Sequence, residues 1–117
     1  MTEKAHVPIA QALARLLEKR GMTQAELCRT AGLSHGTISR YLSGRRGTNL
    51  DSRGANALYK VASALDIDPD YFREYRAYRI RMITVADPGL MDDFYDLVLE
   101  TARLRGLLEE APDNTKE

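Results

Sequence analysis

The 117-residue chain has no tryptophan, one cysteine and two histidines, and no apolar run in it reaches 18 residues. A single cysteine excludes a disulfide within the chain and is typical of a reducing compartment. The absence of a long apolar run excludes a transmembrane helix, and the first residues lack the apolar segment of a signal peptide. We therefore expect a cytoplasmic protein with no membrane partner.

The chain also lacks the residue patterns that signal catalysis or metal binding. Its two histidines and one cysteine form no metal-ligand spacing, and there is no glycine-rich phosphate loop. Asp66, Asp68 and Asp70 imitate the start of a calcium loop, but Tyr71 and Ala77 stand where that loop needs Gly and Glu. We therefore expect no enzyme activity, no catalytic residue, no metal and no cofactor.

The net charge is zero, but the two signs are separated along the chain. Residues 1–81 carry 14 Lys and Arg against 8 Asp and Glu, a net charge of +6. Residues 82–117 carry 3 against 9, a net charge of −6. A basic body favours a nucleic-acid partner, because the local field matters more than the sum. The alternative is chance clustering of solvated charges.

The most informative stretch runs from Met22 to Gly44 and reads as two short helices joined by a tight turn. Thr23 and Glu26 have the spacing of a capping box at the start of the first helix. Gly32 is expected to end that helix in a left-handed conformation, and Ser34 to cap the second helix.

The second helix of this stretch has one apolar side and one small polar side. With Ile38 facing inward, a rotation of 100° per residue places Tyr41 and Leu42 on its flanks. His35 then lies at the edge, and the outward residues are Gly36, Thr37, Ser39, Arg40 and Ser43. A face of small donors and acceptors suits insertion into a groove of nucleic acid.

These residues resemble the Cro/C1 (Xre-type) helix-turn-helix DNA-binding proteins. The matching positions are Thr23, Gln24, Cys28, Gly32, Ser34, Ile38, Tyr41, Leu42, Ser43 and Gly44, followed by the stretch Leu58 to Phe72. The sequence departs from the family at Cys28, where Ala is usual, and in a longer connection over residues 45–54. The resemblance covers roughly residues 8–72 and implies an all-α fold.

We expect a five-helix Cro/C1-type (lambda repressor-like) domain over residues 8–82. Its first helix is expected to start with Pro8 and end near Arg20, after frayed residues 1–7. The fourth helix is expected from Gly54 or Ala55 to Leu65, and the fifth from Pro69 to about Met82. Tyrosines and arginines alternate on this fifth helix, which predicts internal packing, dimerisation or base stacking, with internal packing favoured.

A last helix is expected over about Leu90 to Glu110, within an appendage of residues 88–111. Its apolar residues follow a heptad-like pattern that is typical of helix pairing. The predicted dimerisation residues are Leu90, Phe94, Leu97, Val98, Thr101, Leu104 and Leu108. We expect this seam to pack partly on the fifth helix and partly on a second copy of the chain, giving a homodimer.

The resemblance implies that the helix at residues 34–43 enters the major groove of double-stranded DNA. Carried onto this sequence, the implied base-contacting residues are His35, Gly36, Thr37, Ser39 and Arg40. The implied phosphate-contacting residues are Gln24, Ser34, Ser43, Arg45 and Arg46. Gly36 either lets the backbone approach DNA closely or is simply tolerated in the first turn.

The function that follows is a transcriptional regulator, most simply a repressor, that reads a palindromic operator as a homodimer. One alternative is an antitoxin or adaptor whose acidic C-terminal region binds a protein partner. Another is an architectural protein that binds DNA with low sequence specificity.

Overall fold

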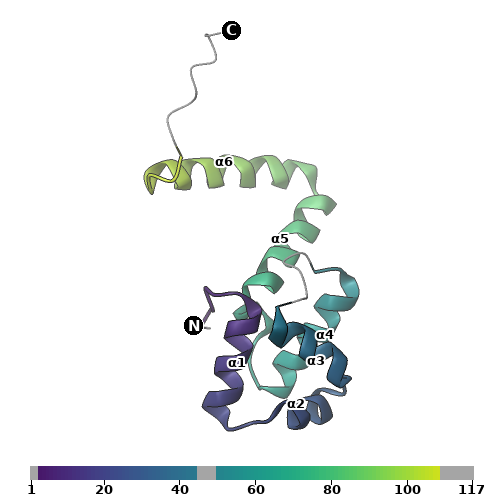
Figure 1. The fold of residues 1–117 in the computed structure, drawn as a ribbon. Helices are drawn as coiled ribbons and strands as arrows, with labels where there is room; N and C mark the ends of the chain where they lie inside the picture. The colour runs from purple at the N-terminus through teal and green to yellow at the C-terminus, as the bar shows by residue number, and fades with distance from the viewer. Residues whose placement is uncertain (1–2, 45–49, 109–117) are drawn as a thin grey trace, which may run out of the picture. The chain divides into compact units, whose positions relative to one another are not determined.

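The computed structural model describes residues 3–44 and 50–108, and throughout these ranges the regular elements are helices, without a strand. In chain order they are α1 (Ile9–Arg20), α2 (Gln24–Ala31), α3 (His35–Ser43), α4 (Ser52–Ala64), the 3-10 helix η1 (Pro69–Tyr71), α5 (Arg73–Ala86) and α6 (Pro88–Leu104). The chain divides into two compact units, Met1–Ile80 and Arg81–Glu117. Figure 1 shows these helices along the chain, and the all-α prediction is confirmed.

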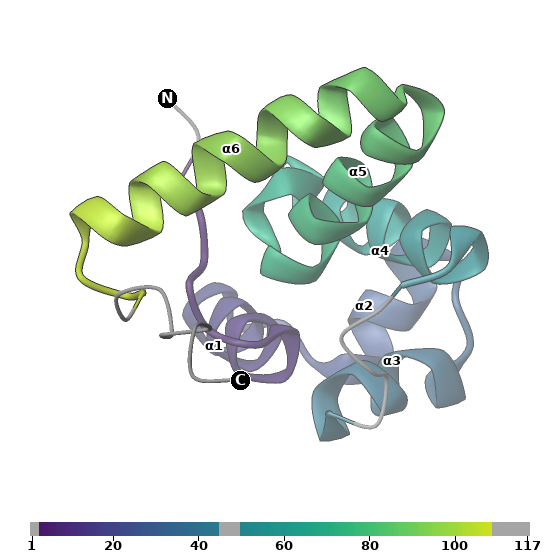
Figure 2. The same cartoon turned by 90° about the horizontal axis from the view of Figure 1, so that it is seen from above.

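The first unit is built around one apolar core, to which α1, α2, α3 and α4 all contribute. Its fully buried large side chains are Leu13, Leu27, Ile38, Tyr41, Leu58, Val61, Leu65 and Phe72. Most of them recur at helical spacing, so each helix buries one side and leaves the opposite side to water. Figure 2 shows these four helices gathered in one body.

The start of α1 differs from its prediction. Pro8 is the N-cap rather than the first helical residue, and it offers no side-chain cap. The carboxylate of Glu74 in α5 takes that role, because its Oε2 accepts the amide of Ile9 at 3.1 Å. Glu74 is only 4% exposed, so a buried carboxyl group lies at the positive end of the α1 dipole.

The prediction of frayed N-terminal residues is wrong for the part that the structure describes. Ala5 is buried, and its amide donates to the carbonyl oxygen of Tyr71 at 2.8 Å. The guanidinium of Arg76 donates to the carbonyl oxygen of Ala5 at 2.7 Å. Because these partners lie more than 65 residues away in the sequence, no local pattern indicates them.

The predicted fourth helix begins two or three residues too late. Asp51 caps α4 by accepting the amide of Gly54 at 2.7 Å, so the helix already begins at Ser52. Helical spacing directs one set of its apolar residues inward, and all of them are buried: Ala55, Leu58, Val61, Ala62 and Leu65.

The predicted fifth helix is interrupted. Asp68 caps η1 with Pro69 at its first position, but Phe72 then adopts an extended backbone and is fully buried. Helix α5 therefore begins at Arg73 and continues to Ala86, beyond the predicted end.

The tyrosines of this segment pack internally, as the favoured alternative predicts. Tyr71, Tyr75 and Tyr78 are half-buried against the core of the first unit. Burial raises the pKa of Tyr75 above its ordinary value of 10.0. Arg79 forms an ion pair with Asp70 at 3.5 Å, which shows that part of the arginine charge is used within the same unit.

Helix α6 begins earlier and ends earlier than predicted. Asp87 caps it by accepting the amide of Leu90 at 3.2 Å, and Pro88 is its first residue. It ends at Leu104, followed by Gly106 with a φ of 69°, whereas the predicted end at Glu110 lies outside the described residues. No residue of α6 is buried. The expected packing of its seam on the fifth helix stays a prediction.

Candidate nucleic-acid interface

Local interactions define the two helices at residues 24–43. Thr23 Oγ1 accepts the amide of Glu26 at 3.1 Å, and Glu26 Oε1 accepts the amide of Thr23 at 2.8 Å. This confirms the predicted capping box. The hydrogen bond from the Thr23 amide lowers the pKa of Glu26, because it stabilises the ionised carboxylate. Gly32 then ends α2 with a φ of 70°, as predicted.

Helix α3 is capped at one end and anchored from behind. Ser34 Oγ accepts the amide of Thr37 at 3.1 Å and lies 2.9 Å from the Thr37 hydroxyl oxygen. Ile38 and Tyr41 are fully buried. The Tyr41 hydroxyl donates to the carbonyl oxygen of Gly54 at 2.8 Å, which ties α3 to the first turn of α4. The orientation predicted for this helix is therefore confirmed.

The opposite side of α3 presents the residues predicted to contact bases. His35, Gly36, Ser39 and Arg40 are exposed, and Thr37 is half-buried. The described part of the chain does not cover them, so α3 offers hydroxyl, imidazole and guanidinium groups on one accessible side. Such groups match the donors and acceptors on base edges in the major groove.

Gly36 has room for a side chain. Among the residues that the structure describes, a Cβ atom built there would meet only the Ser34 hydroxyl oxygen, at 3.9 Å. Packing among these residues therefore does not require glycine at this position. The absence of a side chain matters if a partner such as DNA approaches α3 closely.

The residues predicted to contact phosphates lie at the edges of the same motif. Gln24 is half-buried at the first position of α2, where free backbone amides favour an anion. Ser34 and Ser43 are exposed at the two ends of α3. Arg45 and Arg46 lie outside the described residues, so the structure does not place them.

Helix α4 adds donors that the sequence-based prediction missed. Arg53, Asn56 and Lys60 line a groove of about 230 Å³ together with Thr37 and Arg40 of α3. Their spacing of three and four residues places them on one side of α4. This spacing was available in the sequence, but the prediction for this helix considered only its buried residues.

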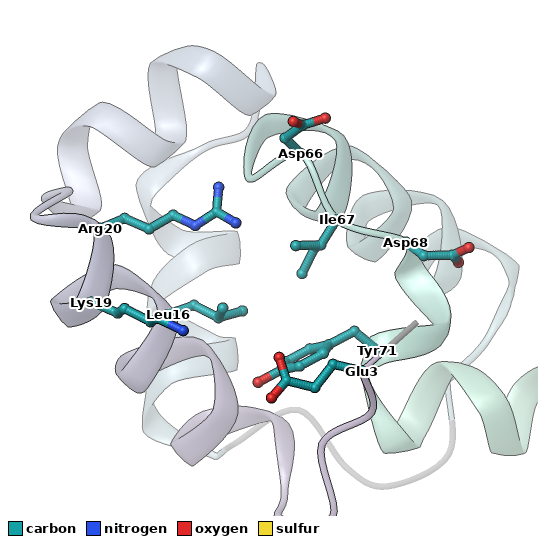
Figure 3. Close-up of a pocket in the computed structure, with 8 residues that line it drawn as sticks. All are labelled: Glu3, Leu16, Lys19, Arg20, Asp66, Ile67, Asp68 and Tyr71. Atoms are coloured by element: carbon teal, nitrogen blue, oxygen red, sulfur yellow. The ribbon is translucent and has the colours of Figure 1, made fainter. Parts of the chain in front are cut away.

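A larger hollow elsewhere in the first unit has mixed charge. Figure 3 shows Lys19 and Arg20 of α1 on one side and Asp66 and Asp68 on the other, with Glu3 also at the hollow. Its volume is about 460 Å³. Carboxylates repel phosphates, so this hollow does not suit a polyanion, and the groove beside α3 does.

Most of the predicted dimerisation residues are exposed to solvent. Leu97 is 64% exposed and Leu104 is 78% exposed, while Phe94 and Thr101 are half-buried. Leu90, Val98 and Leu108 are also exposed. A hollow of about 260 Å³ lies along α6, lined in part by Leu97, Val98 and Thr101. Helix α6 thus leaves several large apolar side chains exposed to solvent.

Within the described ranges, no helix is long and apolar enough to cross a membrane, and no group of three or more candidate ligands could hold a metal ion.

Comparison with known families agrees with this geometry. A helix-turn-helix family model matches residues 13–72, which include α2, α3 and the groove beside α4. The chain belongs to the Cro/C1-type helix-turn-helix family. It is thus a DNA-binding transcriptional regulator. The comparison with curated proteins gave no match, and neither did the comparison with solved structures.

Proposed function

We propose that this helix-turn-helix regulator is a cytoplasmic repressor that reads a palindromic operator as a homodimer. The observation that carries the proposal is the accessible side of α3, where Ser39 and Arg40 are exposed while Ile38 is fully buried behind them. A helix supported in this way can enter the major groove without disturbing the core.

In this proposal the base-contacting residues are His35, Gly36, Thr37, Ser39 and Arg40. Arg40 makes the most discriminating contact, since a bidentate hydrogen bond to guanine is worth ~1–3 kcal/mol. Thr37 donates, accepts or touches a thymine methyl group. Gln24, Ser34 and Ser43 bind phosphates and fix the register of α3 on the duplex.

Selection of bound sequences from a random pool of duplex DNA tests this function. We expect a palindromic motif whose half-sites lie about 34–36 Å apart or a multiple of that distance. Arg40→Ala should lose the preference at one base pair of each half-site, while Arg15→Ala, an exposed arginine of α1, should keep it. A pool without any enriched motif would instead favour an architectural protein of low specificity.

Arg45 and Arg46 are proposed to neutralise phosphates next to the end of α3. Each phosphate contact contributes about 0.9 to the slope of log affinity against log salt concentration. The double variant R45A/R46A should therefore flatten that slope by nearly two. An unchanged slope would remove both arginines from the interface.

The homodimer is proposed to form through α6. Leu97 and Leu104 are the most exposed of the predicted dimerisation residues, so Leu97→Asp and Leu104→Asp should leave the first unit folded. We expect the double variant to sediment as a monomer and to bind the operator much more weakly. If the wild-type chain is itself monomeric, the same exposed apolar side favours the second candidate, an antitoxin or adaptor that binds another protein.

A further inference from the structure

Helix α4 carries a polar edge that the helix-turn-helix motif alone does not require. Arg53, Asn56 and Lys60 are exposed and stand at positions i, i+3 and i+7. The opposite side of the same helix is buried through Leu58 and Val61. The three side chains therefore form one line along α4, which we call the α4 edge.

The α4 edge lies beside the side of α3 that is proposed to face DNA. All three of its residues line one groove with Thr37 and Arg40. The seven residues that line this groove include three cations and no acid. A groove that collects positive charge from two helices attracts the phosphates of a duplex that α3 has entered.

The α4 edge is long enough to contact more than one phosphate. Arg53 and Lys60 are seven residues apart, which corresponds to about 10.5 Å along the helix axis. Phosphates of one strand succeed one another every ~3.4 Å along the duplex axis. Arg53 is the second residue of α4 and therefore lies at the start of this helix. Lys60 lies two turns further along the same helix.

We propose that Lys60, with Asn56 beside it, binds a DNA phosphate and extends the backbone contact of the domain along α4. This proposal rests on the proposed insertion of α3 into the major groove. The contact carries no sequence information, because every base pair presents the same phosphate. Lys60 thus raises the affinity for any duplex that the domain engages.

Salt titrations of full-length protein on the selected operator and on random duplex DNA test the proposal. Lys60→Gln should flatten the slope of log affinity against log salt by about 0.9 on both DNAs, and Lys60→Arg should restore it. The matched control is Lys19→Gln, because Lys19 lines the mixed-charge hollow of Figure 3 and not the groove. The control should keep the wild-type slope.

An unchanged slope in K60Q, with wild-type protein still enriching its motif, would overturn this proposal and leave the proposed function standing. A loss confined to the selected operator would also overturn it, since that result indicates a base contact. If wild-type protein enriches no motif and binds neither duplex, the proposed function fails, and the role of Lys60 fails with it.

Discussion

Replacing Glu74 by alanine should destabilise the first unit, although Glu74 is not one of the proposed DNA-contacting residues. Its Oε2 accepts the amide of Ile9, and Pro8 provides no side-chain cap for α1. An unpaired buried amide costs ~1–3 kcal/mol, and losing a negative charge at a helix N-terminus costs ~0.3–1 kcal/mol.

One effect of the same substitution partly offsets this loss of stability. Within the described residues, Glu74 Oε1 is buried without a hydrogen-bond partner, so truncation also removes a desolvated oxygen. We therefore expect a net loss of about 2 kcal/mol in the free energy of unfolding. For a unit of this size, each kcal/mol lowers the melting temperature by ~4–8 °C.

Urea unfolding followed by circular dichroism measures the effect, with Glu74→Gln and Glu18→Ala as companions. Glutamine keeps an acceptor for the Ile9 amide and should lose less than alanine does. Glu18 is an exposed carboxylate of α1, so its removal should stay within ~0.5 kcal/mol of wild type. A Glu74→Ala protein as stable as the Glu18→Ala control would refute the reasoning that Glu74 caps α1.

Three further predictions concern the helix-turn-helix itself. The hydrogen bond from the Thr23 amide keeps the pKa of Glu26 in the folded protein below its ordinary value of 4.5. The ionised Glu26 side chain therefore stabilises the fold fully above pH 4.5, and this stabilisation is lost as the pH falls through the lowered pKa of the folded protein. Glu26→Gln should therefore flatten the acid limb of stability against pH, measured as urea midpoints. Ile38→Ala should cost ~2–5 kcal/mol, because the side chain is fully buried; a smaller loss in urea unfolding would argue against its anchoring role. Gly36→Ala should raise the free energy of unfolding by at most ~1 kcal/mol yet weaken operator binding, and unchanged binding would show that glycine is merely tolerated there.

The features that the sequence predicted are those encoded by neighbouring residues. Thr23 and Glu26, which form the capping box, are three residues apart. Gly32 adopts a left-handed backbone conformation that glycine itself favours. The start and end of α2 and the buried side of α3 follow from such local rules. For the same reason the accessible residues of α3 could be named before the fold was known.

Some of the missed features, such as the Asp51 cap of α4, are local, but others depend on tertiary contacts. Phe72 leaves the helical conformation while its ring is fully buried, so packing in the core overrides the helical pattern around it. Ala5 is held by Tyr71 and Arg76, and Glu74 serves as the cap of a helix 65 residues away. Pattern analysis within a window cannot find such partners.

The charge separation along the chain suggests how one molecule can serve two partners. Burying a large aliphatic side chain contributes ~1.5–3 kcal/mol, so the exposed apolar residues of α6, such as Leu97, leave substantial binding energy unused. Residues 82–117 carry a net charge of −6, which opposes contact with a duplex as strongly as the net +6 of residues 1–81 favours it. We therefore expect the exposed apolar side of α6 to bind a protein surface rather than DNA. Because Asp92, Asp93, Asp96 and Glu100 lie on α6 and the groove beside α3 holds cations, the proposed protein pairing and the proposed DNA binding would use different parts of the chain.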